Sequence, residues 1–182
     1  MLVAGSDERG RAGSEDAEIM AEVFAEHAAT EVFSTDDPDE GEAFVVARRF
    51  CIPAVEAKGS LLLEDVGVPL PALGRLVTGI ASIAAKRELM ISVIAHAGDG
   101  NTHPLIVYDP ADADMTERAH LAFGEIMDLA VGLGGTITGE HGVGRLKRPW
   151  LAGYLGPDVM ELNQRIKHAL DPLGILNPGA AI

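Results

Sequence analysis

Residues 91–108 read ISVIAHAGDGNTHPLIVY, in which two β-rich runs flank a cluster of glycine, aspartate and asparagine. Such a cluster between two strands is typical of a β-hairpin. With residues 98–101 as the loop, His96 pairs with His103. Residues directly opposite in an antiparallel pair share a face of the sheet, with Cβ atoms roughly 5 Å apart. The pattern therefore predicts two imidazoles side by side, placed to bind one ion.

The segments on both sides of this hairpin predict two helices and two more strands. Apolar residues at helical spacing predict amphipathic helices over residues 73–87 and 113–133. Strands are expected over residues 60–68 and 135–138. Residues 60–138 then follow the order strand, helix, strand, strand, helix, strand, which is the ferredoxin-like βαββαβ plan. We predict an α+β fold with an antiparallel sheet and helices packed on one face.

The two ends of the chain are expected to form smaller parts. Residues 1–59 predict a partial βαβ unit, with short strands at residues 2–4 and 30–34 on either side of a helix at residues 14–29. A second helix is expected to end at Arg49, shortly before a proline.

After the core, residues 139–182 predict a glycine-rich loop followed by a helical tail, with helical pieces at residues 149–155 and 159–170. No low-complexity linker divides the chain. The sequence thus predicts one α+β core at residues 60–138 with a segment added at each end.

Composition excludes several classes of protein. The chain has 182 residues, 47% of them hydrophobic, and a formal net charge of −14 without a basic block, so nucleic acid and anionic membrane are poor partners. No apolar run is long enough for a transmembrane segment, and the N-terminus does not resemble a signal peptide. The single cysteine, Cys51, fits a reducing compartment. We expect a soluble cytoplasmic protein, and a homo-oligomer is compatible with the sequence.

A second glycine-rich stretch, GEHGVGR at residues 139–145, contributes a carboxylate and a third imidazole. It matches neither common phosphate-loop pattern, and a glutamate inside an anion site would repel phosphate. Together with the hairpin it offers His96, His103 and Glu140, a ligand set with an open position that is used by catalytic metal sites. Zinc, manganese and iron all accept such ligands. Taken alone, this set also fits a small metallohydrolase in which Glu140 or His141 activates water.

Four motifs resemble one known family: HAGDGNTHP at residues 96–104, GGTITGEHGVG at 134–144, EDVGVP at 64–69 and DPLGILNPG at 171–179. They are similar to the C-terminal, substrate-side domain of FAD-linked oxidases, the group of the glycolate oxidase large subunit, D-lactate dehydrogenase and D-2-hydroxyglutarate dehydrogenase. The resemblance implies a flavoenzyme that oxidises a small 2-hydroxy acid to a 2-oxo acid, with hydride transfer to FAD.

The resemblance also implies roles for individual residues. His96, His103 and Glu140 match positions that bind a divalent metal. His141 matches the general base that removes the hydroxyl proton, and Arg48 matches an arginine that binds the substrate carboxylate.

Three further residues match positions near the cofactor: Asn101, Gly142 and Asn177.

Some positions depart from the family pattern. Val45 stands where a tryptophan usually precedes the carboxylate-binding arginine. Leu63 and Leu105 replace a lysine and an asparagine of hydroxyglutarate-type members, which favours a glycolate- or D-lactate-like substrate. The family's FAD-binding domain is not expected within this chain, so an FAD-binding domain or subunit is the implied partner. Alone, the chain is expected not to oxidise substrate; a non-catalytic interaction domain is the remaining alternative.

Overall fold

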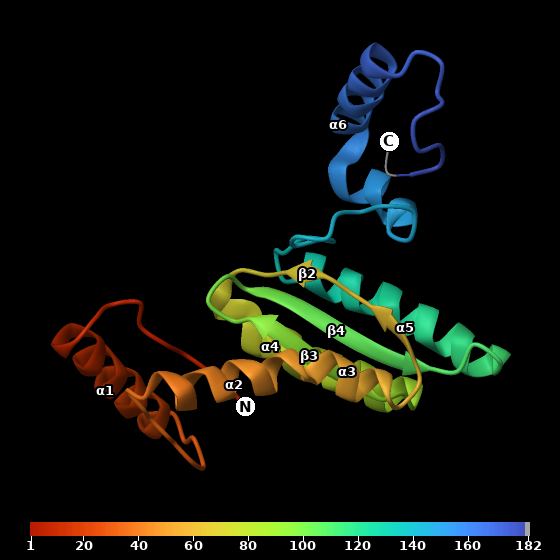
Figure 1. The fold of residues 1–182 in the computed structure, drawn as a ribbon. Coiled ribbons are helices and arrows are strands. Elements are labelled where there is room, and N and C mark those ends of the chain that lie inside the picture. Colours follow the sequence, from red (N-terminus) through yellow and green to blue (C-terminus); the bar gives the residue numbers. More distant parts are fainter. Residues whose placement is uncertain (181–182) are drawn as a thin grey trace. The chain divides into compact units, whose positions relative to one another are not determined.

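The computed structural model describes residues 1–180 and divides the chain into two compact units, Met1–Pro53 and Ala54–Ile182. The boundary falls within helix α3 (Cys51–Glu56). Figure 1 shows the elements of both units along the chain. The candidate site residues, with the exception of Arg48, lie in the second unit.

The first unit is helical. It contains α1 (Arg11–Glu26) and α2 (Pro38–Arg49), and the side chain of Asp37 accepts a hydrogen bond from the Asp39 amide at the start of α2. The strands predicted at residues 2–4 and 30–34 do not form, so the prediction of a partial βαβ unit was wrong. A short β-prone run becomes a strand only when another strand satisfies its backbone groups, and these runs have no such partner among the described residues.

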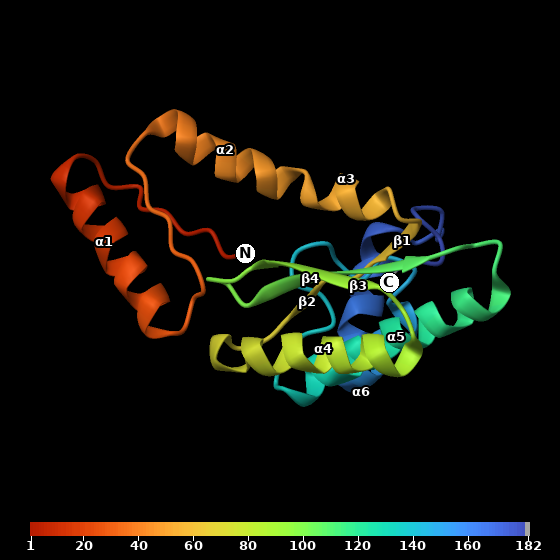
Figure 2. The same cartoon turned by 90° about the horizontal axis from the view of Figure 1, so that it is seen from below.

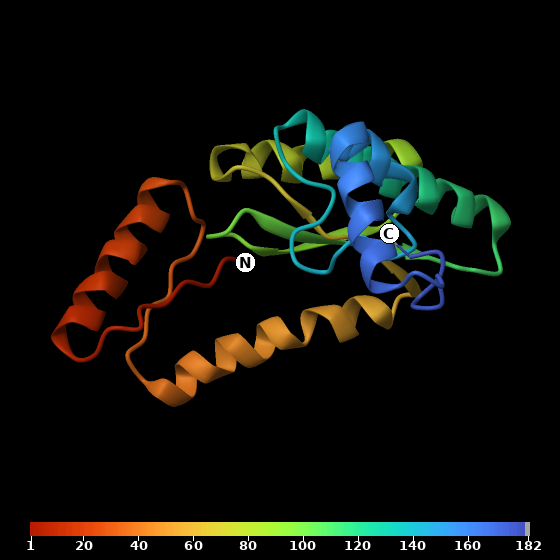
Figure 3. The same ribbon diagram turned by 90° about the horizontal axis from the view of Figure 1, so that it is seen from above.

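The second unit is built on a small antiparallel sheet, which confirms the predicted α+β class. Strand β4 (Asn101–Tyr108) is central, with β3 (Ile91–His96) on one side. On the other side lie β1 (Ser60–Leu63) and β2 (Val66–Gly67). Figures 2 and 3 show two helices, α4 (Leu73–Arg87) and α5 (Ala113–Gly132), on one face of this sheet.

Strands β1 and β2 form one extended path with a break in the middle. Their pairings with β4 have the same register on both sides of the break. Pro104 of β4 lies at the break; it has no amide hydrogen to donate, although its carbonyl accepts from the Glu64 amide at 2.9 Å. The shared register places Asp65 directly opposite His103.

The β3–β4 hairpin differs from its predicted register. His96 pairs with Asn101, and His103 pairs with Ile94, so the turn comprises residues 97–100. The predicted pairing of His96 with His103 was therefore wrong. The shift is two residues, and side chains alternate with a period of two, so both histidines still lie on the same face.

The strand predicted at residues 135–138 is reduced to a single bridge between Thr136 and Gly67. The amides of the residues that follow bond to the Asp65 side chain instead of extending a ladder. The bridge lies beside β2, so the segments still follow the ferredoxin-like order of bridge, β1/β2, β4 and β3.

The core lies between the sheet and two helices, α4 (Leu73–Arg87) and α5 (Ala113–Gly132), whose predicted bounds are confirmed to within one residue. A short 3₁₀ helix, η1 (Leu70–Ala72), leads into α4. Each fully buried large apolar side chain contributes roughly 1.5–3 kcal/mol to folding. The largest of these in the core are Leu76, Ile80, Ile106, Phe123, Ile126, Met127 and Ile137.

The tail forms α6 (Arg148–Leu170), which is kinked at Gly156 (φ 76°, ψ 169°) just before Pro157. The two predicted helical pieces are thus confirmed as the two arms of this element. The Trp150 ring packs edge-on against Phe123, with ring centroids 6.2 Å apart, and joins the tail to the core. Within the described residues, none of the helices combines the length and apolar character needed to cross a membrane.

The hairpin turn depends on a glycine at residue 100. Its φ is +72°, and a Cβ atom there would lie 2.1 Å from the Val68 carbonyl oxygen, which is backbone and cannot easily move. We expect Gly100→Ala to cost about 1–3 kcal/mol through overlap, and roughly 1–2 kcal/mol more through backbone strain. Gly98→Ala in the same turn is the control, because a Cβ there meets open space. Chemical denaturation measures both variants, and equal stabilities would contradict this account.

Candidate metal and substrate site

Three predicted ligands converge on one point of the second unit. His96 ends β3, His103 lies within β4, and Glu140 comes from the loop after the bridge. The Glu140 Oε1 atom is 3.1 Å from His103 Nε2 and 3.5 Å from His96 Nε2. The two imidazole rings stand at 89°, with centroids 5.4 Å apart. One ligand atom from each side chain lies within 4.8 Å of the others, which is the separation required of groups that share an ion.

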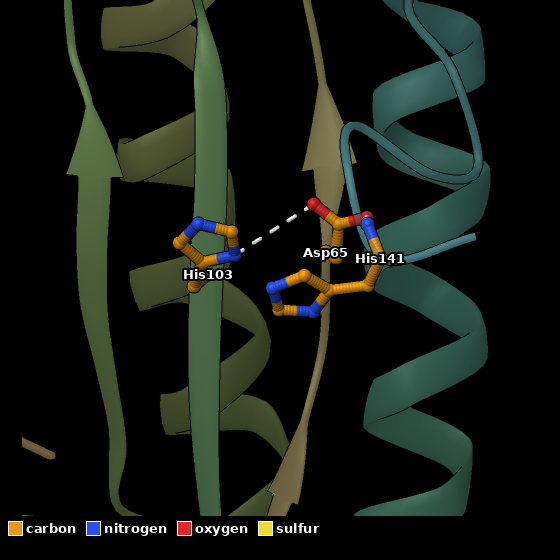
Figure 4. A group of neighbouring side chains, drawn as sticks. All are labelled: Asp65, His103 and His141. Carbon is orange, nitrogen blue, oxygen red and sulfur yellow. Dashed lines mark hydrogen bonds and ion pairs between the residues drawn. The ribbon is translucent and has the colours of Figure 1, made fainter.

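His141 joins the same cluster. Its ring stacks on that of His103, with centroids 4.7 Å apart and planes at 9° (Figure 4). Its Nε2 atom is 3.7 Å from Glu140 Oε1. The side chain is 43% exposed, whereas that of His103 is 9% exposed. His141 is therefore, like the 39% exposed His96, an imidazole that a small molecule can reach.

Asp65 was not predicted as a site residue, yet its side chain organises the loop that carries Glu140 and His141. It is 1% exposed. One oxygen, Oδ2, accepts from the Thr138 hydroxyl at 2.7 Å and from three consecutive amides, those of Gly139 (2.8 Å), Glu140 (3.0 Å) and His141 (2.9 Å). An available signal was the pair of acids in the otherwise apolar strand LLLEDVG, residues 61–67.

These donors determine the charge of Asp65. Burial raises the pKa of a carboxyl group, but the hydrogen bonds from Thr138 and from the amides of His141 and Gly139, together with the charge of Lys147, outweigh burial and hold the pKa of Asp65 below its usual value. Asp65 is therefore an anion at neutral pH.

His103 faces this anion. Its Nδ1 atom is 3.6 Å from Asp65 Oδ1, the contact marked by the dashed line in Figure 4, and is buried without a hydrogen-bond partner among the described residues. Burial, followed by the neighbouring His141, lowers the pKa of His103, although Asp65 and Glu140 oppose this shift. A lowered pKa favours the neutral imidazole, the form that binds metals.

A buried ion pair between Lys147 and Glu64 lies next to Asp65. The Lys147 ammonium is 2.5 Å from Glu64 Oε1, and the two side chains are 6% and 0% exposed. Lys147 also donates to the Ile137 carbonyl at 2.8 Å and to the Asp65 carbonyl. Burial raises the pKa of Glu64 to about 7, against the attraction of Lys147.

The raised pKa of Glu64 predicts a pH dependence of stability. The folded protein binds this proton more tightly than the unfolded chain, so the contribution of Glu64 is most favourable below pH 4.5 and is lost as the pH rises to about 7. We expect the free energy of unfolding to fall more between these pH values in the wild type than in Glu64→Gln. Denaturant titrations at several pH values measure the difference, and parallel curves would contradict it.

A surface pocket of about 520 Å³ opens beside the cluster, with His96 and Glu140 in its wall. Asn101 also lines it and is 9% exposed, and its Oδ1 atom is buried without a hydrogen-bond partner among the described residues. A Cβ on Gly139, another wall residue, would lie 2.1 Å from this Oδ1. The pocket thus places space for a small molecule beside His96 and Glu140 of the cluster.

The remaining predicted residues, Gly142, Asn177 and Arg48, lie outside the cluster. The cluster consists of His96, His103, Glu140 and His141. Gly142 directly follows His141, with φ +83°, and its amide donates to the Thr138 hydroxyl at 2.9 Å. Asn177 is exposed in the tail, next to Pro178, whose carbonyl accepts from Arg145 at 3.1 Å. Arg48 lies in the last turn of α2, in the first unit.

Comparisons with known proteins identify the family of the chain. A family described as FAD linked oxidases, C-terminal domain, matches residues 1–181. The chain is 39% identical over 165 residues to glycolate oxidase subunit GlcD of Bacillus subtilis, covering 90% of the chain and 35% of that protein. It is 35% identical over 169 residues to the GlcD subunit of Escherichia coli (92% and 34% covered).

A third relative is the mitochondrial D-lactate dehydrogenase [cytochrome] of Arabidopsis thaliana, which is 32% identical over 171 residues (92% of the chain and 30% of that protein). The chain thus spans about a third of the length of the curated relatives it matches. A family match over almost every residue, together with relatives above 30% identity, shows that the chain belongs to the FAD-linked oxidases and corresponds to their C-terminal domain.

Proposed function

We propose that this chain is the substrate- and metal-binding domain of an FAD-dependent enzyme that oxidises a small 2-hydroxy acid, of the glycolate or D-lactate kind, to the 2-oxo acid. The names of its relatives support the reaction. The observation that carries the proposal is the convergence of His96, His103 and Glu140 within 4.8 Å of one another. The relatives favour this function over a small metallohydrolase with the same ligands.

The donor set fits a divalent cation. Two imidazoles and one carboxylate suit zinc, manganese or ferrous iron, and leave positions for a substrate. The lowered pKa of His103 favours the neutral ring that such a site needs. When bound, the metal would polarise the substrate hydroxyl, and FAD would accept the two electrons.

The chain's own residues would bind the substrate and remove its proton. His141 stacks on a proposed ligand and is partly exposed, so its ring can take a proton from a hydroxyl held beside it. Arg48 would bind the substrate carboxylate through its guanidinium group. Asn101, Gly142 and Asn177 would contact the cofactor, which an FAD-binding domain or subunit would bind.

Metal titration tests the core of this proposal. We expect the purified chain to bind one equivalent of Zn²⁺ or Mn²⁺ in isothermal titration calorimetry. His103→Gln should weaken binding by on the order of 100-fold, because loss of a ligand exceeds the roughly 10- to 100-fold effect of altering its supporting groups.

The matched control is His120→Gln. His120 is exposed on α5, where its Nδ1 atom bonds the Thr116 carbonyl, so its replacement should leave metal binding unchanged. Equal weakening by both substitutions, or binding unaffected by either, would argue against the site.

A further inference from the structure

The two halves of the site come from distant parts of the chain and meet at one carboxylate. Asp65 Oδ2 binds the loop that carries Glu140 and His141 through three successive amides. The other oxygen, Oδ1, faces His103 across the sheet, in the position opposite it in the strand register. Oδ1 also accepts from the Glu140 amide at 3.3 Å, so this oxygen contacts both His103 and the loop, whereas Oδ2 contacts the loop alone.

The contact with His103 constrains the proton on its ring. A neutral imidazole carries one hydrogen, on either Nδ1 or Nε2. Asp65 is an anion and only accepts hydrogen bonds, so a hydrogen on Nδ1 is favoured, and the lone pair is left on Nε2. Nε2 is the atom that lies 3.1 Å from Glu140 Oε1, at the convergence point.

The separation of 3.6 Å between His103 Nδ1 and Asp65 Oδ1 is longer than a standard hydrogen bond. Hydrogen bonds in catalytic sites are often long before a ligand binds and shorten afterwards. No described residue competes for this Nδ1 atom, which is buried and otherwise without a partner.

We propose that Asp65 is a positioning residue that sets His103 in the tautomer with hydrogen on Nδ1 and, through the same carboxylate, fixes the Glu140–His141 loop. The consequence for metal affinity rests on the proposed function, whereas the tautomer does not. Asp65, His103 and His141 also lie within 4.8 Å of one another, but Asp65 Oδ1 faces His103 Nδ1, whereas Glu140 lies beside the other ring nitrogen, Nε2. Asp65 therefore acts through His103 and the loop rather than as a ligand.

The first test measures the tautomer in the wild-type protein and uses a substitution only to assign the signal. Nitrogen-15 NMR of the histidine rings at roughly pH 8, where histidine is neutral, distinguishes a protonated Nδ1 from a protonated Nε2. We expect His103, assigned by its loss in His103→Gln, to show hydrogen on Nδ1. A hydrogen on Nε2 would overturn the proposal.

The second test replaces Asp65 by Asn, which keeps the size of the side chain. With its carbonyl toward the loop amides, its NH₂ group points at His103 Nδ1 and donates to it, which forces the hydrogen to Nε2. In Ser-His-Asp hydrolases, replacing the aspartate beside the catalytic histidine with asparagine lowers kcat because the histidine then adopts the wrong tautomer. We expect the NMR signature to switch and Zn²⁺ affinity to fall about 10- to 100-fold. An unchanged tautomer in a folded variant would overturn the proposal.

Asp99→Asn is the matched control. Asp99 lines the surface pocket together with His96 and Glu140, whereas His103 does not line it, so this change removes one negative charge near the proposed site. In Asp99→Asn, the tautomer of His103 and the Zn²⁺ affinity should remain those of the wild type. A loss of Zn²⁺ affinity equal to that of Asp65→Asn would overturn the proposal, because it would indicate a general effect of removing a negative charge. If the wild type binds no Zn²⁺, the metal site of the proposed function is refuted. The nitrogen-15 NMR signal of the His103 ring still tests the role of Asp65 in that case.

Discussion

Replacing Lys147 with methionine is expected to lower the free energy of unfolding by about 3–5 kcal/mol, because removal of one partner leaves a buried charge unpaired. Glu64 is fully buried, and its pKa is already raised to about 7 by that burial. The carbonyls of Asp65 and Ile137 would also lose their ammonium donor. Denaturant unfolding near pH 8 measures the loss, which should shrink near pH 5, where Glu64 takes up a proton.

Two controls identify the cause. Lys86→Met removes a lysine whose ion pair with Glu125 is 62% exposed on the lysine side, so it should cost no more than about 1 kcal/mol. Combining Lys147→Met with Glu64→Leu replaces the whole pair by apolar groups and should recover part of the stability. If Lys147→Met were as mild as Lys86→Met, the buried pair would not be a main support of the site.

Replacing His141 with glutamine is expected to lower kcat for a 2-hydroxy acid by about 10²- to 10⁴-fold, the usual contribution of a general base. The measurement requires the enzyme with its FAD-binding domain or subunit, as proposed above. The substitution should leave Zn²⁺ or Mn²⁺ affinity of the chain close to that of the wild type, because the proposed ligands are His96, His103 and Glu140. Steady-state kinetics and calorimetry together separate the two effects.

His120→Gln serves again as the control and should retain full kcat, since this exposed histidine lies on α5. A loss of metal affinity in His141→Gln, matching the loss in kcat, would make His141 a ligand rather than a base. A kcat within a few fold of the wild type would exclude the catalytic role.

The helices and the class of fold were predictable because local patterns determine them. The apolar spacing at residues 73–87 reflects a helix face that packs on a sheet, and the structure places α4 at those bounds. The first unit was not predictable in the same way. Residues 2–4 and 30–34 have β-prone composition, but a strand needs a partner, and strand partners are a property of the whole fold.

The cluster of histidines was predictable despite an error in register. His96 and His103 share a face whether the hairpin turn comprises residues 98–101 or 97–100, because the two registers differ by two residues. Asp65 could not be found in this way. Its position opposite His103 depends on the pairing of β1 and β2 with β4, which joins residues far apart in the chain.

The sequence by itself determined which residues can carry the chemistry, because the histidines, the glutamate and the glycine-rich turns are local features whose periodicity sets their face. Only the tertiary structure decided how they are supported. A buried carboxylate between β1 and β2 accepts hydrogen bonds from three amides of a loop that begins more than seventy residues later. A buried lysine neutralises the neighbouring glutamate. Such contacts depend on burial and on long-range pairing, and neither is encoded in the spacing of nearby residues.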